Sequence, residues 1–124
     1  MSNTVMFCAW GGTYPGREPF ALKHYEEFVE ILKKLEADGE IERFETFLLT
    51  PYGGEFDGFT LIYGEPEKLS TLMMRDDLHR LQIQTKRENA KFVIAWATTG
   101  AAAEKEFALY GELVSEYEHV PELV

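Results

Sequence analysis

The stretch TVMFCAW, from Thr4 to Trp10, decides the fold of this chain. No side chain after Thr4 is polar, and side chains on a strand point alternately to its two faces. One face would carry Val5, Phe7 and Ala9, and the other Met6, Cys8 and Trp10. Both sets are apolar, so the pattern predicts a strand that is buried on both sides. The sequence GGTYPG that follows predicts the end of this strand.

Helical periodicity follows from Glu18 to about Asp38. An apolar stripe recurs there at three- and four-residue steps, with charged residues outside it, and it consists of Leu22, Tyr25, Phe28, Val29, Leu32 and Leu35. Gly39 is the expected stop signal. The segments IERFETFLLT and FTLIYG then predict two strands, joined as a hairpin by the glycine-rich loop PYGGEFDG.

A second helical region begins near Pro66, a residue favoured in the first turn of a helix. Its apolar phase breaks near Asp76 and Asp77, and either aspartate is expected to cap a new helix that ends at Asn89. That helix carries the stripe Leu78, Leu81 and Thr85. AKFVIAWATTG predicts the last strand, apolar on both faces, and a final helix is expected at about 101–120.

The order of elements is β-α-β-β-α-β with one added helix. We therefore expect an α+β fold: a ferredoxin-like unit with an antiparallel four-stranded sheet and two helices on one face. A single domain would span residues 1–124, with its core at 4–98. In the final helix Phe107, Tyr110, Val114 and Tyr117 share one arc. This helix is expected to pack across a dimer or over the rim of the helix-sheet cleft, where Tyr110 or Tyr117 would close a pocket.

Composition narrows the choice of partners. The chain has 124 residues and a net charge of −10, which disfavours nucleic acid and anionic membrane surfaces. No apolar run is long enough for a membrane helix, and the N-terminus lacks the pattern of a secretory signal. The single cysteine cannot form an internal disulfide. These features predict a cytoplasmic protein that binds neither nucleic acid nor membrane.

A sheet with apolar residues on both faces needs two covers. Helices cover one face, and a second copy of the sheet would cover the other, so a homodimer is expected. This arrangement resembles the dimeric α/β-barrel superfamily. The resemblance rests on PGREPFALKHYEEFVEILKKLEADGEIERF and on GFTLIYGEPEKLSTLMMRDDLHRL, and it spans residues 4 to about 97. Members include antibiotic biosynthesis monooxygenases without cofactors, isomerases, haem-degrading enzymes and stress-responsive proteins with no assigned activity.

The resemblance implies a ligand between the helices and the sheet. The candidates for proton transfer are His24, His79 and Tyr63, and those for ligand contact are Trp10, Tyr25, Trp96 and Tyr110. Trp10, Tyr63 and Trp96 are expected to cluster, on the premise that the first, third and fourth strands run parallel. Cys8 is either a small buried hydrophobe or a nucleophile activated by His24.

Two functions of different classes follow. The first is binding of a small apolar or aromatic molecule, with oxygenation or isomerisation and no cofactor or metal. The second is a non-catalytic dimeric module, structural or regulatory, whose core is filled by its own side chains. Haem binding ranks third: the resemblance makes His79 the matching iron ligand, but Tyr63 stands where the haem-degrading members have tryptophan.

Overall fold

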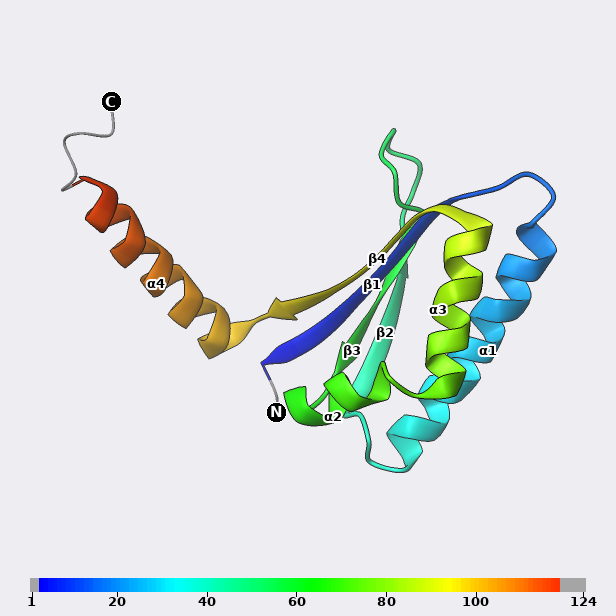
Figure 1. The fold of residues 1–124 in the computed structure, drawn as a ribbon, viewed down its shortest axis with the longest axis horizontal. Coiled ribbons are helices and arrows are strands. Elements are labelled where there is room, and N and C mark those ends of the chain that lie inside the picture. The colour runs from blue at the N-terminus through cyan, green and yellow to red at the C-terminus, as the bar shows by residue number, and fades with distance from the viewer. Residues whose placement is uncertain (1–2, 119–124) are drawn as a thin grey trace.

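The computed structural model describes residues 3–118, and it has the ferredoxin-like order of elements. Figure 1 shows a sheet with helices on one face and a separate helix beyond one end of the sheet. In chain order the elements are β1 (Thr4–Thr13), α1 (Glu18–Ala37), β2 (Arg43–Leu48), β3 (Gly58–Tyr63), α2 (Pro66–Leu72), α3 (Asp76–Glu88), β4 (Asn89–Thr98) and α4 (Gly100–Glu118). The predicted α+β class is confirmed, and the last two residues of the predicted final helix lie outside the described residues.

The four strands form one antiparallel sheet in the order β2-β3-β1-β4. β1 lies in the middle and pairs antiparallel with both β3 and β4. The expectation that these three strands run parallel is therefore wrong. In the βαββαβ order β1 runs opposite to its two neighbours, so Trp10 faces Gly58 at one end of the sheet while Val5 faces Tyr63 at the other.

β1 is buried on both faces, as its sequence predicts. Val5, Met6, Cys8 and Ala9 are each at most 5% exposed. The strand runs on to Thr13, beyond the predicted break at Gly11. At Gly11 a Cβ atom would lie 2.0 Å from the carbonyl oxygen of Glu55, so the missing side chain admits the β2–β3 loop. The strand thus reaches Asn89, the first residue of β4.

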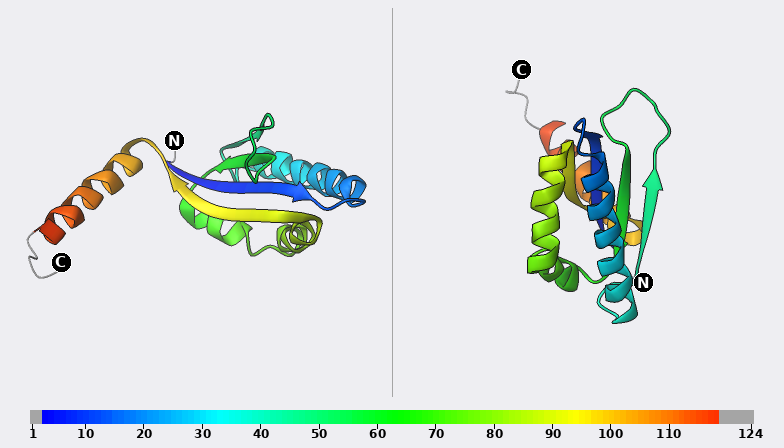
Figure 2. Two further views of the ribbon diagram at one scale, coloured as in Figure 1. Left: turned by 90° about the horizontal axis from the view of Figure 1, so that it is seen from above. Right: turned by 90° about the vertical axis from the view of Figure 1, so that its right-hand side faces the viewer.

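The core lies between the sheet and the helices. Figure 2 shows α1 and α3 side by side in front of the sheet. The buried apolar residues come from both layers, and they include Met6, Cys8, Leu32, Leu35, Ile62, Leu69 and Leu78. Leu22 belongs to the predicted stripe of α1 but is 60% exposed, because it lies at the rim of a cavity described below.

The opposite side of the sheet, here called the outer face, is covered by none of the helices in residues 3–118. It carries Phe7, Phe47, Phe59, Leu61 and Val93, which follow from the register of the strands. The rings of Phe7 and Phe47 lie 5.3 and 5.0 Å from that of Phe59. Phe47 is 40% exposed and Val93 38%. Apolar side chains on both edge strands of this face are therefore open to solvent.

The helical region after β3 breaks where its apolar phase changes. α2 ends at Leu72 and α3 begins at Asp76. The expectation that Asp76 or Asp77 caps α3 is wrong: Arg75 is the N-cap residue, and its side chain forms no capping hydrogen bond. Both aspartates lie in the first turn of α3, where their negative charges interact favourably with the helix dipole.

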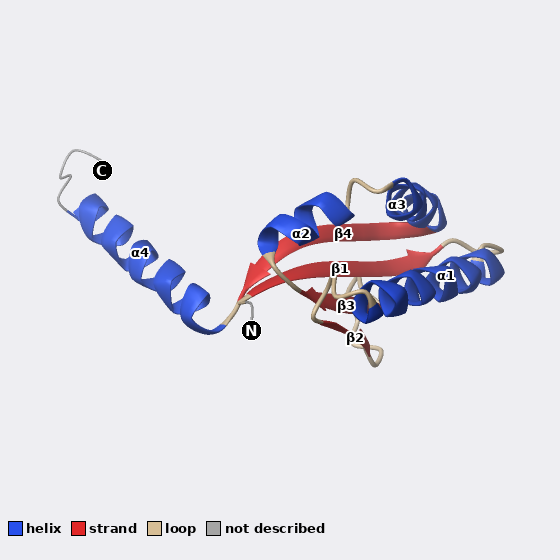
Figure 3. Cartoon of the chain, turned by 90° about the horizontal axis from the view of Figure 1, so that it is seen from below, coloured by secondary structure: helices blue, strands red, loops and turns tan. Residues whose placement is uncertain are grey.

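The last helix, α4, does not pack on its own domain. Figure 3 shows it leaving the end of β4 and pointing away from the sheet. Phe107, Tyr110 and Tyr117 are 77%, 68% and 70% exposed. The alternative in which this helix covers the rim of its own cleft is therefore wrong, because β4 ends at the opposite end of the sheet from that cleft. Within residues 3–118, no helix is long and apolar enough to cross a membrane.

Candidate functional site

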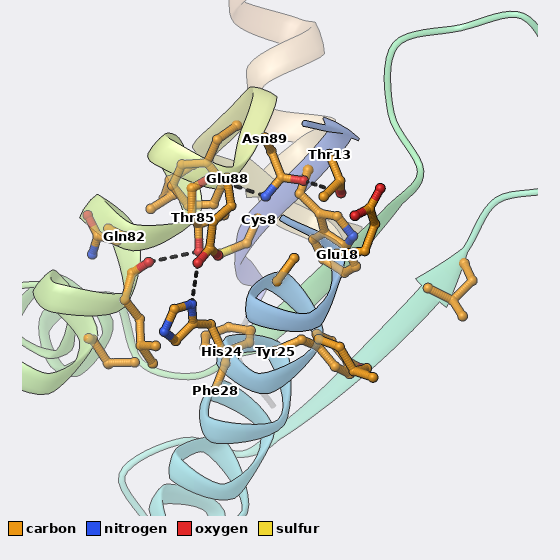
Figure 4. Close-up of a pocket in the computed structure, with 18 of the residues that line it drawn as sticks. Cys8, Thr13, Glu18, His24, Tyr25, Phe28, Gln82, Thr85, Glu88 and Asn89 are labelled. Atoms are coloured by element: carbon orange, nitrogen blue, oxygen red, sulfur yellow. Dashed lines mark hydrogen bonds and ion pairs between the residues drawn. The ribbon is translucent and has the colours of Figure 1, made fainter. Parts of the chain in front are cut away.

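A cavity of about 360 Å³ lies between the helix layer and the sheet. Its walls come from α1, α3, the helix-facing side of β1 and β4, and the end of β2. Most of the lining is apolar: Cys8, Trp10, Ala21, Leu22, Tyr25, Phe28, Leu48, Met73, Leu78, Leu81, Phe92 and Ile94. The polar lining residues are Thr13, Glu18, His24, Gln82, Thr85, Glu88 and Asn89. Figure 4 shows the cavity from close by.

The cavity opens to solvent at Leu22 and Leu48. These two lining side chains are 60% and 77% exposed. Leu48 lies near Trp10, since a Cβ atom at Gly58 would approach both side chains, at 3.1 and 3.0 Å. The Trp10 and Tyr25 rings lie 5.7 Å apart at 46°. An aromatic pair thus lies inside the opening, in contact range of any molecule that enters.

The polar centre of the cavity is a histidine–carboxylate pair. Nδ1 of His24, on α1, lies 2.5 Å from Oε2 of Glu88, on α3. The two side chains are only 13% and 9% exposed. Figure 4 shows the bond bridging the two helices. A carboxylate can only accept, so a neutral imidazole here carries its proton on Nδ1 and presents a lone pair at Nε2.

The other ring nitrogen of His24, Nε2, has no hydrogen-bond partner in the described part of the chain. Within residues 3–118, Gln84 Oε1 is the one buried side-chain nitrogen or oxygen atom that lacks a hydrogen-bond partner. His24 Nε2 also makes no hydrogen bond, so it is not among the fully buried atoms. Protein atoms therefore leave Nε2 partly accessible, and His24 is one of the residues that line the cavity. An imidazole held in place by a carboxylate, in the wall of a largely apolar cavity, has the arrangement expected of a general base.

Glu88 is buried because of its place on α3. The residues Leu78, Leu81 and Thr85 face the sheet at helical spacing, and the next position in that series is Glu88. It is the last residue of the helix, where the dipole disfavours a negative charge. Its backbone carbonyl oxygen accepts a bond of 2.8 Å from the N–H of Tyr14. The backbone thus fixes the carboxylate at a position where His24 becomes its partner.

A second polar chain continues from this pair along the cavity wall. The hydroxyl of Thr13 donates to Oδ1 of Asn89 at 2.7 Å, and Nδ2 of Asn89 donates to the carbonyl of Thr85 at 3.1 Å. Asn89 is 6% exposed. These bonds join the end of β1 to the junction at which α3 passes directly into β4. They fix the backbone immediately after Glu88, and so position its carboxylate.

Cys8 also lines the cavity, on the sheet side. Burial raises the pKa of its thiol from 9.0 to about 12. A thiol of this kind stays protonated at neutral pH, whereas nucleophilic cysteines are thiolates. The buried-hydrophobe alternative for Cys8 is therefore the one that the chemistry of the site favours.

Three of the seven candidate residues meet in this cavity: His24, Tyr25 and Trp10. The other four lie elsewhere. Tyr63 is on the outer face, with the Arg43 guanidinium 3.7 Å from the centre of its ring. Trp96 pairs with Met6, far along β1 from Trp10.

The two remaining candidates, His79 and Tyr110, lie on helices but outside the cavity lining. His79 is exposed in the first turns of α3, on the side away from the lining positions Leu78 and Leu81. Tyr110 is on α4, which leaves the domain. The proton-transfer and ligand-contact roles thus remain predictions, but only His24, Tyr25 and Trp10 lie at one place.

Sequence reasoning did not identify Glu88. A signal was present, because the stripe Leu78, Leu81 and Thr85 reaches Glu88 at the next step of three. An acidic residue on the apolar side of a helix needs a buried partner, and this would have directed attention to the histidine on the facing helix.

The chain matches no protein-family model and no curated protein. Solved structures show the same fold. A dimeric ferredoxin-like protein of unknown function from Jannaschia sp. CCS1 is 8% identical, with a TM-score of 0.60 over 77% of this chain and 99% of that one. An antibiotic biosynthesis monooxygenase is 13% identical, with a TM-score of 0.53 over 77% and 98%. Hydroxynitrile lyase from Passiflora edulis is 8% identical, with a TM-score of 0.58 over 82% and 97%. The chain therefore shares the ferredoxin-like fold of dimeric proteins and of monooxygenase-like proteins.

Proposed function

We propose that the protein binds a small, largely apolar or aromatic molecule in the cavity and moves a proton at Nε2 of His24. The observation that carries this proposal is the 2.5 Å His24–Glu88 pair in the wall of an otherwise apolar cavity. A volume of about 360 Å³ is within the range of small-molecule sites. Glu88 would act as a positioning residue, since it orients the imidazole and stabilises the imidazolium that forms.

Proton removal is the step common to the reactions considered. In an isomerisation Nε2 would take a proton from a carbon next to a carbonyl and return it to another carbon. In an oxygenation without cofactor the deprotonated molecule itself would reduce dioxygen. Both need an acidic C–H or O–H group within hydrogen-bond distance of Nε2 and little water around it. Tyr25 and Trp10 would hold the aromatic or apolar body of the ligand.

A homodimer is the assembly that we propose for the chain. The outer face exposes Phe47 and Val93 beside an aromatic row, and a second copy of the same face would cover it. A two-fold pairing makes the patch self-complementary. The similar structure from Jannaschia sp. CCS1 is described as a dimeric ferredoxin-like protein, which supports this assembly.

The alternative is a non-catalytic dimeric module. Its cavity would hold no ligand, and the His24–Glu88 pair would only join α1 to α3. Binding of a neutral fluorescent probe, N-phenyl-1-naphthylamine, separates the two. We expect saturable binding that the cavity-filling change Ala21→Trp abolishes. No saturable binding, with the wild-type fold intact, would favour the module.

Proton transfer is tested with 2-tetralone, a neutral ketone with acidic C–H groups. In D₂O we expect the protein to accelerate exchange of those hydrogens, followed by NMR. His24→Gln should remove most of the acceleration, and His79→Gln, which changes an exposed histidine outside the cavity, should not. Equal rates for the two variants would contradict the role of His24.

A further inference from the structure

The lining of the cavity contains carboxylates and no strongly basic side chain. Glu18 and Glu88 are among the lining residues, and no lysine or arginine is. The chain as a whole carries −10. A bound carboxylate or phosphate would lose its hydration in an apolar space and gain no cationic side chain in return. The cavity is therefore unsuited to anionic metabolites.

The polar corner of the cavity, formed by His24, Glu88 and Asn89, has a fixed arrangement of hydrogen-bond donors and acceptors. Glu88 accepts from Nδ1 of His24, so Nε2 of the neutral imidazole can accept and cannot donate. The amide of Asn89 has its oxygen on Thr13 and its nitrogen on the carbonyl of Thr85, so its main bonds are already made. A ligand would therefore find an acceptor at this corner. It would need a donor group of its own to satisfy it.

We infer that the site selects uncharged ligands that carry a hydrogen-bond donor on an apolar, ring-sized body, such as phenols and enols. Glu88 is the residue that sets this selection: its charge repels anions, and its bond to His24 fixes the acceptor at Nε2. This inference rests on the proposed ligand-binding function. It adds the charge and the polarity of the ligand, which the cavity volume alone does not give.

A positively charged ligand is disfavoured for a separate reason. Oε2 of Glu88 is engaged by His24, and the carboxylate side chain is only 9% exposed. An ammonium group would have to lose its hydration to reach a carboxylate that is already paired. The cost of burying an unpaired or half-paired ion exceeds that of burying a neutral hydroxyl.

Four probes with one ring system test the inference: 2-naphthol, its methyl ether 2-methoxynaphthalene, 2-naphthoate and 2-naphthylmethylamine. Binding to the full chain at neutral pH would be measured by calorimetry. We expect 2-naphthol to bind tightest. The ether, which lacks the donor, should bind about tenfold more weakly, as one lost hydrogen bond implies. The carboxylate and the ammonium should bind at least ~100-fold more weakly.

Glu88→Gln removes the negative charge at the polar corner. We expect the ratio of 2-naphthol to 2-naphthoate affinity to fall about tenfold or more in this variant. Glu27→Gln is the matched control, since it removes one exposed carboxylate from α1 outside the cavity lining. It should leave the ratio unchanged. The ranking of probes on the wild-type protein tests the inference even if Glu88→Gln does not fold.

The outcomes separate this inference from the function on which it depends. If none of the probes binds, the proposed ligand-binding function is wrong. If 2-naphthoate or the amine binds as tightly as 2-naphthol, the site binds ligands but the charge selection is wrong. If the ether equals 2-naphthol, the donor requirement is wrong. An equal change of the ratio in Glu27→Gln would show that net charge, not Glu88, determines the selection.

Discussion

The thiol of Cys8 illustrates how burial alone changes a residue's chemistry. The unfolded thiol ionises near pH 9, whereas burial raises the pKa of the folded one to about 12. The unfolded state therefore loses its proton first as pH rises. The stability that comes from burying the neutral thiol is fully present below pH 9 and is lost as pH rises toward 12.

We expect Cys8→Ala to lower the free energy of unfolding by about 1 kcal/mol at pH 7.5, from the small cavity it leaves. At pH 10 the ionised unfolded thiol should cost the wild type about 1.4 kcal/mol, so the difference should disappear. Urea unfolding at the two pH values measures this. A difference that is the same at both, or fast labelling of the native thiol at pH 7.5, would contradict it.

The His24–Glu88 pair should be energetically coupled because both side chains are nearly buried. A double-mutant cycle with His24→Asn and Glu88→Gln should give a coupling energy of about 1–3 kcal/mol in chemical unfolding. The matched control is the Arg75–Asp77 pair at 3.0 Å, whose side chains are 45% and 41% exposed. Solvent screens that pair, so its cycle should give less than ~1 kcal/mol. Similar coupling energies for the two pairs would mean that burial does not strengthen the His24–Glu88 interaction.

At the scale of elements, Gly11 allows β1 and the β2–β3 loop to approach each other. The N–H of Asp57 donates to the carbonyl of Trp10 at 2.8 Å, and that of Gly12 to Oδ2 of Asp57 at 3.2 Å. A side chain at Gly11 would collide with the backbone of Glu55. Those bonds could then not form as they are.

Gly11→Ala should therefore lower the melting temperature by several degrees, as a loss of roughly 1–3 kcal/mol implies. Gly111→Ala is the control: a Cβ atom there meets nothing within 4 Å. Alanine is the better helix former by about 1 kcal/mol, so this change should stabilise α4. A melting temperature of Gly11→Ala equal to that of the wild type would show that the loop is free to move away.

The elements were predictable from the sequence because their patterns are local. The helical spacing of apolar residues predicted α1, and the change in that spacing near Asp76 predicted the break between α2 and α3. The pairing of Trp10 with Gly58, and the distance between Trp10 and Tyr63 along the sheet, depend on strand direction. Strand direction is a property of the whole topology, so a residue's position within its own strand does not reveal it.

The site was predictable only in part for the same reason. The three predicted residues that line the cavity come from two consecutive elements, Trp10 from β1 and His24 and Tyr25 from α1. Glu88 is 64 residues from His24 in the chain. Their contact depends on two helices lying side by side on the sheet, and no local spacing rule encodes that neighbourhood.

For the molecule as a whole, the outer face and α4 leave apolar surface uncovered. If two copies pair through the outer face, Val93→Glu should convert a dimer into a monomer, because a charge would be buried without a partner. Met74→Glu is the control, since Met74 is 81% exposed on the helix side. Light scattering at micromolar concentration measures the mass. A wild-type monomer, or a dimeric Val93→Glu variant, would contradict the proposed pairing.

α4 should contribute to the same assembly, because a lone helix of 19 residues is marginal in water unless its apolar arc is covered. We expect a chain that ends after Thr99 to dimerise more weakly, by about tenfold or more in Kd. Sedimentation at several concentrations measures the change. If the shortened chain keeps the same Kd and melting temperature, α4 has no part in pairing.

The alternation of side chains along β1 has a consequence for how such a protein can evolve. Even-numbered positions, Cys8 and Trp10, form the wall of the cavity, and odd-numbered ones, Phe7 and Ala9, belong to the outer face. Substitutions at the two sets can therefore accumulate independently, one altering which molecules are accepted and the other which copies associate. A single-residue deletion in this strand would exchange the sets and destroy both properties at once. Insertions and deletions should thus be purged from β1 among descendants of this gene while substitutions are tolerated.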